Sequence, residues 1–141
     1  MTALDISKEA LQVVVTHSPN ARLVQADIEN TPWPLLGETF DTVVVTNYLW
    51  RPVFPKLLTS LKDGGFLIYE TFAVGNEAVG KPSRPDFLLK SKELLSLCAS
   101  LNVVAYEEGF LTAPDRFVQR IVAAKSAAKM GASPDLPRFH L

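Results

Sequence analysis

The sequence predicts an α/β fold in which a mostly parallel sheet ends in an antiparallel hairpin. The first observation is the order of segments between residues 40 and 72: a β-branched run at 43–45, a helix opening at Pro52, two glycines at 64–65, and a second apolar run at 66–69. This order predicts two parallel strands joined by a crossover helix. The second is a pair of apolar segments, 103–111 and 117–124, whose short connection favours antiparallel pairing.

Length and composition indicate one globular domain over residues 1–124 and a tail at 125–141 that we expect to be flexible. The 141 residues are 48% hydrophobic, which is enough for a core. A formal net charge of −1 gives no reason to expect nucleic acid or a membrane surface as partner. The one cysteine, Cys98, excludes an internal disulfide and a two-cysteine metal site, so we expect no metal. With no apolar run of membrane-spanning length and no signal peptide, the expected location is cytoplasmic.

Two short strands and a helix are predicted in the first 27 residues. The first strand ends at Asp5, Ser7 is placed to cap the helix that follows, and the second strand covers 22–26. Asp27 then follows the second strand as Asp5 follows the first. Ligands of such sheets bind beyond the carboxyl ends of the strands, so both carboxylates are binding-site candidates. The alternatives are structural: Asp5 stabilises a helix N-terminus, and Asp27 closes a turn.

The segment at 40–72 predicts a second group of candidates. Because its strands are apolar throughout, we expect both of their faces to be covered. The buried side of the helix is assigned to Leu57, Leu58 and Leu61, and the glycines at 64–65 to its exit. Asn47 and Tyr48 follow one strand and Glu70 ends the other, so these three should face one crevice.

The longest irregular stretch, residues 73–90, predicts a functional loop whose apolar end at 87–89 packs back on the body. A last helix, capped by Ser91, follows, with its apolar face at 94, 95, 98 and 101. Asn76, Lys81 and Arg84 on this loop are candidates for binding an anionic substrate, and Arg51, which follows the 43–45 strand, is a further candidate for binding substrate.

Several motifs in this order resemble those of the class I S-adenosylmethionine-dependent methyltransferases. The segment LKDGG at 61–65 is similar to the turn before that family's fifth strand, ALDIS at 3–7 to the end of its second strand, and QADI at 25–28 to the segment after its third. TNYLWRP at 46–52 and GKPSRPDFLL at 80–89 resemble segments of small bacterial members.

The resemblance implies a Rossmann-like fold and methyl transfer from S-adenosylmethionine to a small molecule. It assigns the ribose hydroxyls to Asp5 with Ile6 beside it, and adenine to Asp27 and Ile28. It places the catalytic and substrate groups after the fourth and fifth family strands, at Asn47, Tyr48 and Glu70, and makes residues 73–90 a lid.

One family element is not found in the sequence. The seven glycines form no G-x-G arrangement, whereas the family uses a glycine-rich turn after its first strand to hold the cofactor. We therefore expect a chain that starts at the family's second strand, is N-terminally truncated, and binds S-adenosylmethionine weakly or not at all. The gap left by a central strand predicts either direct pairing of the second and fourth family strands or a homodimer that fills the gap.

Two other functions remain open from the sequence. The first is a non-catalytic, methyltransferase-like partner or oligomerisation module. The second is a nicotinamide-dependent enzyme, because an acidic residue after the second strand binds ribose there too.

Overall fold

The computed structural model describes residues 1–127, which form two compact units, Met1–Glu38 and a second that begins at Thr39. Residues 128–141, which hold most of the expected tail, lie outside the described residues. The predicted mixture of parallel strands and a closing antiparallel hairpin is confirmed. Each unit is described by itself below.

The first unit holds two parallel strands and one helix. Strand β1 (Thr2–Asp5) pairs in register with β2 (Arg22–Gln25), and α1 (Lys8–His17) connects them. Ser7 caps α1 as predicted, because its side chain accepts a hydrogen bond from Ala10 N at 3.1 Å. Leu11 is the buried residue of this helix.

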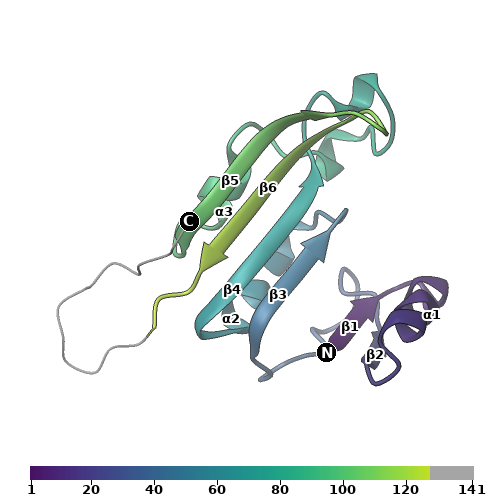
Figure 1. Cartoon of the computed structure of the whole chain (residues 1–141), viewed down its shortest axis with the longest axis vertical. Coiled ribbons are helices and arrows are strands. Elements are labelled where there is room, and N and C mark those ends of the chain that lie inside the picture. The colour runs from purple at the N-terminus through teal and green to yellow at the C-terminus, as the bar shows by residue number, and fades with distance from the viewer. Residues whose placement is uncertain (128–141) are drawn as a thin grey trace. The chain divides into compact units, whose positions relative to one another are not determined.

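The second unit is built on a four-stranded sheet in the order β3-β4-β6-β5 (Figure 1). Strands β3 (Phe40–Thr46) and β4 (Leu61–Phe72) are parallel. Strand β6 (Arg116–Ala124) runs antiparallel to both β4 and β5 (Asn102–Leu111). The closing hairpin thus joins the sheet of the 43–45 strand, as predicted.

The crossover between β3 and β4 is shorter than predicted. A 3₁₀ turn, η1 (Arg51–Val53), leads into α2 (Phe54–Thr59), and Leu61 already pairs with Phe40 as the first residue of β4. Leu61 is fully buried from the strand rather than from the helix. The positive backbone angle expected of the glycine pair is found at Gly64, where φ is 79°.

Helix α3 (Glu93–Leu97) does not begin as predicted. Lys92, in a left-handed conformation, precedes it, and Ser91 instead donates to Glu108 on β5 at 3.3 Å. The apolar face is nevertheless confirmed, since Leu94, Cys98 and Leu101 are buried.

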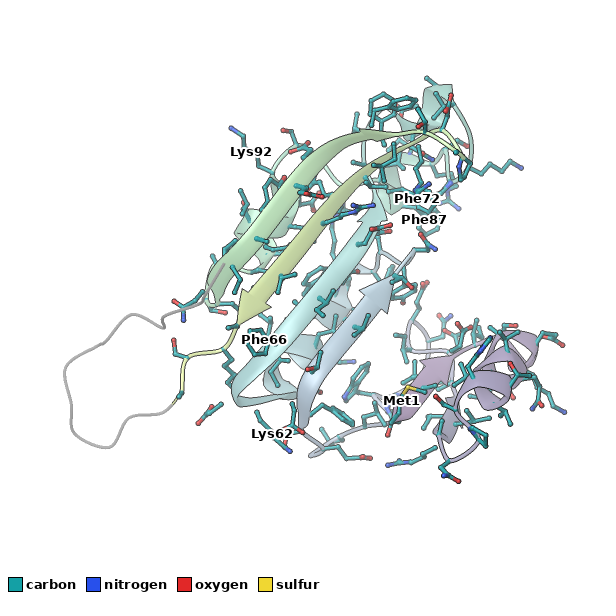
Figure 2. All side chains as sticks on the ribbon, viewed as in Figure 1. Met1, Lys62, Phe66, Phe72, Phe87 and Lys92 are labelled. Carbon is teal, nitrogen blue, oxygen red and sulfur yellow. The ribbon has the colours of Figure 1, made fainter. Side chains whose placement is uncertain are left out.

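The helices α2 and α3 both lie on one face of the sheet (Figure 1). That face holds the core of the unit, including Leu67, Tyr69 and Ile121, with the ring of Phe54 stacked on that of Tyr69 at 5.0 Å. The expectation that both faces of the 43–45 strand are covered is wrong. Val44 and Ile68, which pair across β3 and β4 on the other face, are 61% and 41% exposed. Figure 2 shows the side chains along these strands, with Phe66 marking the start of the apolar part of β4.

Residues 73–90 contain two short 3₁₀ turns, η2 (Asn76–Ala78) and η3 (Pro85–Phe87). The segment returns to the sheet as predicted: Ala73 forms a parallel bridge with Leu89, and Leu88 and Leu89 are buried. The expected direct pairing of the second and fourth family strands is wrong, because β1 pairs with β2 in one sheet and β3 with β4 in the other.

Candidate functional site

The first candidate group lies at the carboxyl ends of β1 and β2. These strands are parallel and in register, with Asp5 beside Gln25. Two hydrogen bonds continue the pairing past the strand ends: Ala26 N donates to Asp5 O at 3.1 Å, and Gln25 Nε2 donates to Ile6 O at 3.1 Å. The structure therefore brings the segments that hold Asp5 and Asp27 to the same edge of the sheet.

Asp5 keeps much of its capacity to accept hydrogen bonds. Its Oδ1 accepts from Ser7 N at 2.8 Å, and within residues 1–127 this is the one protein donor on the carboxylate. An ionised carboxylate has about four acceptor positions, so room remains for two hydroxyl donors. The Ser7 contact also fixes the direction of the carboxylate at the start of α1. Ile6, next in the chain, is 63% exposed and offers an apolar surface there.

Asp27 is engaged in a local turn. Its Oδ1 accepts from the backbone N–H groups of Glu29 and Asn30 at 3.1 and 3.2 Å, and its Oδ2 accepts from Asn30 Nδ2 at 2.8 Å. The side-chain hydrogen bond from Asn30 is the largest cause of a lowered pKa at Asp27. These contacts are those of a turn residue, and they leave less acceptor capacity than Asp5 has. Ile28, inside the same turn, is half-buried.

The second candidate group lies at the carboxyl ends of β3 and β4. Asn47 N donates to Glu70 O at 2.9 Å, so the two strand ends are tied together. Asn47 adopts a left-handed backbone with φ of 53°, a conformation that asparagine tolerates better than most residues, and the chain turns out of the sheet here. Tyr48 is held by its backbone, since Tyr69 Oη donates to Tyr48 O at 2.6 Å. Asn47, Tyr48 and Glu70 therefore lie at the same ends of β3 and β4, and that they face one crevice stays a prediction.

Glu70 is not a free carboxylate. Its Oε2 lies 2.6 Å from Arg120 Nε, and Arg120 Nη1 lies 3.3 Å from Glu107 Oε2. The three residues face one another across β4, β6 and β5 in register. A carboxylate paired in this way is held in one orientation by the guanidinium.

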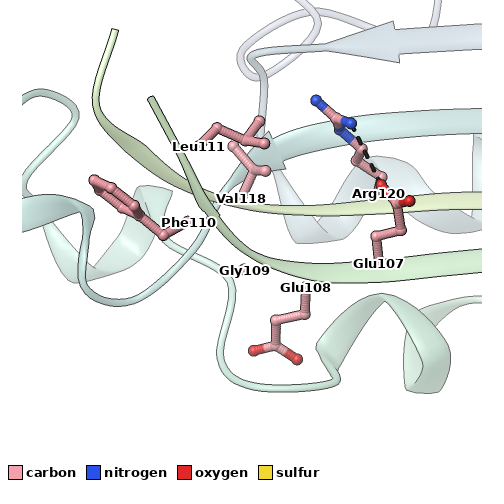
Figure 3. Close-up of a pocket in the computed structure, with 7 residues that line it drawn as sticks. All are labelled: Glu107, Glu108, Gly109, Phe110, Leu111, Val118 and Arg120. Atoms are coloured by element: carbon pink, nitrogen blue, oxygen red, sulfur yellow. Dashed lines mark hydrogen bonds and ion pairs between the residues drawn. The ribbon is translucent and has the colours of Figure 1, made fainter. Parts of the chain in front are cut away.

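A shallow pocket of about 210 Å³ adjoins this ionic row. Figure 3 shows Arg120 and Glu107 directed toward one another, with Glu108 directed to the opposite side of the hairpin. The lining residues come from β5 and β6 and are Glu107, Glu108, Gly109, Phe110, Leu111, Val118 and Arg120. Sequence reasoning missed Arg120 and Glu107. The alternation of side chains along a strand predicts that Glu70 lies on the same face as Ile68. That Arg120 and Glu107 lie beside Glu70 depends on the register of the hairpin, which the sequence does not give.

Two of the residues expected to bind substrate have their polar atoms committed within the chain. Arg51 donates to Glu93 and to the carbonyl oxygens of Asp86 and Leu88. The hydrogen bond to Glu93 is the largest cause of a raised pKa at Arg51. Asn76 is 1% exposed.

The amide of Asn76 joins two segments. Its Nδ2 donates to Pro82 O at 3.0 Å, and its Oδ1 accepts from Phe117 N at 3.2 Å. Arg51 and Asn76 thus both hold the 73–90 segment against the rest of the second unit.

Lys81 and Arg84 remain exposed on that segment. Arg84 Nη2 donates to Asp86 Oδ2 at 3.1 Å, and its guanidinium lies 5.1 Å from the centre of the Phe87 ring. Both contacts are to neighbours in sequence and on the surface, so the two positive charges are accessible to a ligand. No helix within residues 1–127 has the length and apolar character needed to cross a membrane.

Comparison with known proteins gives a match to one family model and matches to solved structures. Residues 1–69 match the family model described as a methyltransferase domain. No curated protein sequence matches the chain.

Solved structures match over most of the chain. TehB from Haemophilus influenzae is 16% identical, with a TM-score of 0.68 over 89% of this chain and 49% of TehB. The N-methyltransferase NodS from Bradyrhizobium japonicum is 15% identical, with a TM-score of 0.66 over 89% of this chain and 72% of NodS. The [4+2]-cyclase SpnF is 13% identical, with a TM-score of 0.62 over 90% of this chain and 66% of SpnF.

These matches confirm the predicted resemblance and the Rossmann-like fold class. The chain spans about half the length of TehB. Because SpnF is a cyclase by name, the shared fold does not fix the reaction.

Proposed function

We propose that this chain, which has the class I S-adenosylmethionine-dependent methyltransferase fold and matches the methyltransferase domain over residues 1–69, serves methyl transfer to a small molecule. The observation that carries the proposal is the carboxylate of Asp5, fixed by Ser7 N at the end of β1 and otherwise open to hydroxyl donors. Solved neighbours include NodS in complex with S-adenosyl-L-homocysteine.

S-Adenosylmethionine is the cofactor that this site fits. Asp5 would accept hydrogen bonds from the two ribose hydroxyls, with Ile6 beside them. Asp27 and Ile28 would lie against the adenine, where the turn held by Asn30 fixes the backbone and the half-buried Ile28 supplies an apolar wall. When bound, the cofactor supplies the activated methyl group. We expect weak affinity in the 141-residue chain, because its sequence offers no G-x-G turn of backbone donors.

The residues at the ends of β3 and β4 would position the methyl acceptor. Transfer of a methyl group from a sulfonium mainly needs an in-line nucleophile and the exclusion of water, so the protein contributes orientation more than proton transfer. Asn47 and Tyr48 are held by the ends of the strands and can hydrogen-bond an acceptor. Glu70, held by Arg120, would help to orient the acceptor.

The exposed charges of the 73–90 segment point to an acceptor that carries an anionic group. Lys81 and Arg84 would contact it. Arg51 and Asn76 would act by holding the segment in place, since their polar atoms are committed to Glu93, Pro82 and Phe117. We propose a cytoplasmic enzyme and a second copy of the chain as its protein partner.

Calorimetric titration with S-adenosyl-L-homocysteine tests the cofactor site. We expect Asp5→Asn to weaken binding by about 10- to 100-fold, because two hydrogen bonds to a charged acceptor are reduced to bonds with a neutral one. Asp63→Asn, an exposed carboxylate on β4 outside the site, is the matched control and should leave the affinity unchanged. Binding that Asp5→Asn leaves unchanged contradicts the assignment of Asp5.

The same titration separates the two alternatives. Binding of NADH in preference to S-adenosyl-L-homocysteine would favour a nicotinamide-dependent enzyme. Failure to bind either nucleotide at millimolar concentration would favour the non-catalytic module.

A further inference from the structure

Three apolar side chains lie exposed on the 73–90 segment and at the end of β5. Val74, Val79 and Phe110 are 55%, 40% and 46% exposed. Figure 3 shows the Phe110 ring directed away from Arg120. Single exposed apolar side chains are common on protein surfaces, whereas a group of them marks a binding surface. The positions of these three relative to one another therefore decide what they mean.

Contacts with strand β6 bring the three side chains to the same part of the second unit. The ring of Phe110 packs on that of Phe117, with the ring centres 5.0 Å apart. Gly75 lies against the Phe117 ring, because a Cβ atom built on Gly75 would be 2.9 Å from Cγ of Phe117. Val74 precedes Gly75 in the chain, and Val79 ends the short turn η2 that follows it. We call Val74, Val79 and Phe110 the Phe110 surface.

The turn that carries Lys81 is fixed beside Phe117 by one side chain. Gly80 N donates to Asn76 O at 2.9 Å, and Asn76 Nδ2 donates to Pro82 O at 3.0 Å, so both neighbours of Lys81 are bound to Asn76. Asn76 Oδ1 in turn accepts from Phe117 N at 3.2 Å. A single residue thus separates the Lys81 turn from the strand whose Phe117 ring supports the Phe110 surface.

The cations of the segment can take an anion. Lys81 forms no ion pair within residues 1–127. Arg84 already holds a carboxylate, that of Asp86 at 3.1 Å, in a pair that is open to solvent. The acidic residue nearest to the Phe110 surface in the chain, Glu77, is engaged by the backbone, since its Oε2 accepts from Gly75 N at 2.8 Å. The segment therefore offers positive charge beside apolar surface.

We propose that the Phe110 surface and its two cations bind a small aromatic carboxylate, with the ring on Phe110 and the carboxylate on Lys81 and Arg84. An exposed cation holds an anion weakly because water competes for both, whereas an aromatic ring gains apolar contact and a favourable ring pair with Phe110. A molecule with both groups gains both contacts. This inference rests on the proposed function where it makes the aromatic carboxylate the methyl acceptor.

Amide chemical shifts of the full chain, without cofactor, test the binding site. The probe is phenylacetate, and its matched probes are phenylacetamide, which lacks the charge, and acetate, which lacks the ring. We expect phenylacetate to bind at least about fivefold more tightly than either, because each lacks one of the two contacts. The shifts should be confined to residues 74–84 and 109–117. Equal binding of the three probes, no binding of phenylacetate, or shifts elsewhere would overturn the proposal.

Substitution of the ring separates the apolar contact from the ionic one. Phe110→Leu keeps an apolar side chain and removes the aromatic ring, so we expect it to weaken phenylacetate about threefold and to leave acetate unchanged. Phe40→Leu, the same change at the start of β3, is the matched control and should have no effect on either probe. Equal weakening by the two substitutions would contradict a contact between phenylacetate and Phe110.

Removal of the charges gives the complementary result. The double variant Lys81→Gln with Arg84→Gln should weaken phenylacetate about fivefold and leave phenylacetamide unchanged, because only the charged probe loses a partner. Lys8→Gln, on the exposed side of α1, is the control and should change neither. Phenylacetate binding that the double variant leaves unchanged would overturn the assignment of the carboxylate. Because these titrations use no cofactor, their failure leaves the Asp5 titration unaffected, and a failure of the Asp5 titration leaves them unaffected.

Discussion

Arg51 and Glu93, which are 42 positions apart in the sequence, form a bidentate ion pair. Arg51 Nε donates to Glu93 Oε1 at 2.6 Å, and Arg51 Nη2 donates to Glu93 Oε2 at 3.0 Å. The same guanidinium donates to the carbonyl oxygens of Asp86 and Leu88, and Glu93 Oε2 also accepts from Lys90 N at 2.8 Å. The pair therefore joins the start of the crossover, the end of the 73–90 segment and helix α3.

We expect Glu93→Gln to lower the free energy of unfolding by about 1–2 kcal/mol, because charge-assisted hydrogen bonds are replaced by neutral ones in a half-buried site. Urea unfolding measures the change. Glu38→Gln is the control, since its ion pair with Arg22 is more exposed and should contribute less than about 0.5 kcal/mol. Equal effects of the two substitutions would contradict the joining role of Glu93.

The same carboxylate predicts a dependence of stability on pH. The hydrogen bond from Arg51 is the largest cause of a pKa at Glu93 below the usual value of 4.5. A group whose pKa is lower in the folded state stabilises that state above its unfolded pKa and loses the effect as the pH falls through the folded pKa. The difference in unfolding free energy between the native chain and Glu93→Gln should therefore be constant above pH 4.5 and shrink below it. Urea unfolding from pH 7 to pH 3 checks this, and a difference that grows on acidification would contradict it.

Gly75 is predicted to resist substitution for two reasons. Its φ is 107°, and a Cβ atom built there would lie 2.9 Å from Cγ of Phe117. We expect Gly75→Ala to destabilise the chain by about 2–3 kcal/mol. Gly80→Ala, in the same segment, meets no atom within 4 Å and needs no positive φ, so it is the control and should be near neutral. Thermal unfolding of the two variants measures the difference. A Gly80→Ala variant that is less stable than Gly75→Ala would contradict the prediction.

Gln119 is a buried polar link from β6 to α3 and to the residues just before that helix. Its side chain is 0% exposed; Oε1 accepts from Leu94 N at 3.1 Å, and Nε2 donates to Lys90 O at 2.6 Å. Gln119→Leu leaves both backbone groups without this partner, and we expect a loss of about 2–4 kcal/mol.

Hydrogen exchange gives a second measurement for this link, because the Leu94 amide should lose protection. Gln12→Leu, on the exposed side of α1, is the control and should change stability by less than about 0.5 kcal/mol. Unchanged protection of the Leu94 amide in Gln119→Leu would show that the link does not hold α3.

The sequence predicted most strand and helix positions because their signals are local. The capping hydroxyl of Ser7, the β-branched run at 43–45 and the short connection before β6 each act within a few residues, and each led to an element that the structure contains. The same local reasoning failed at Ser91 because its hydroxyl bonds Glu108 of β5, 17 positions away, instead of capping α3. The candidate group Asn47, Tyr48 and Glu70 followed from one rule, that neighbouring parallel strands end at one edge.

The sequence by itself determined that the chain is a parallel α/β sheet closed by a hairpin, and that acidic and polar residues follow the strands. The tertiary structure decided which of those residues are free to bind. Register across three strands places Arg120 on Glu70, and packing of the 73–90 segment commits Arg51 and Asn76 to the fold. Only the tertiary structure shows that Val44 and Ile68 are exposed, because exposure depends on which elements pack together and not on how apolar a strand is.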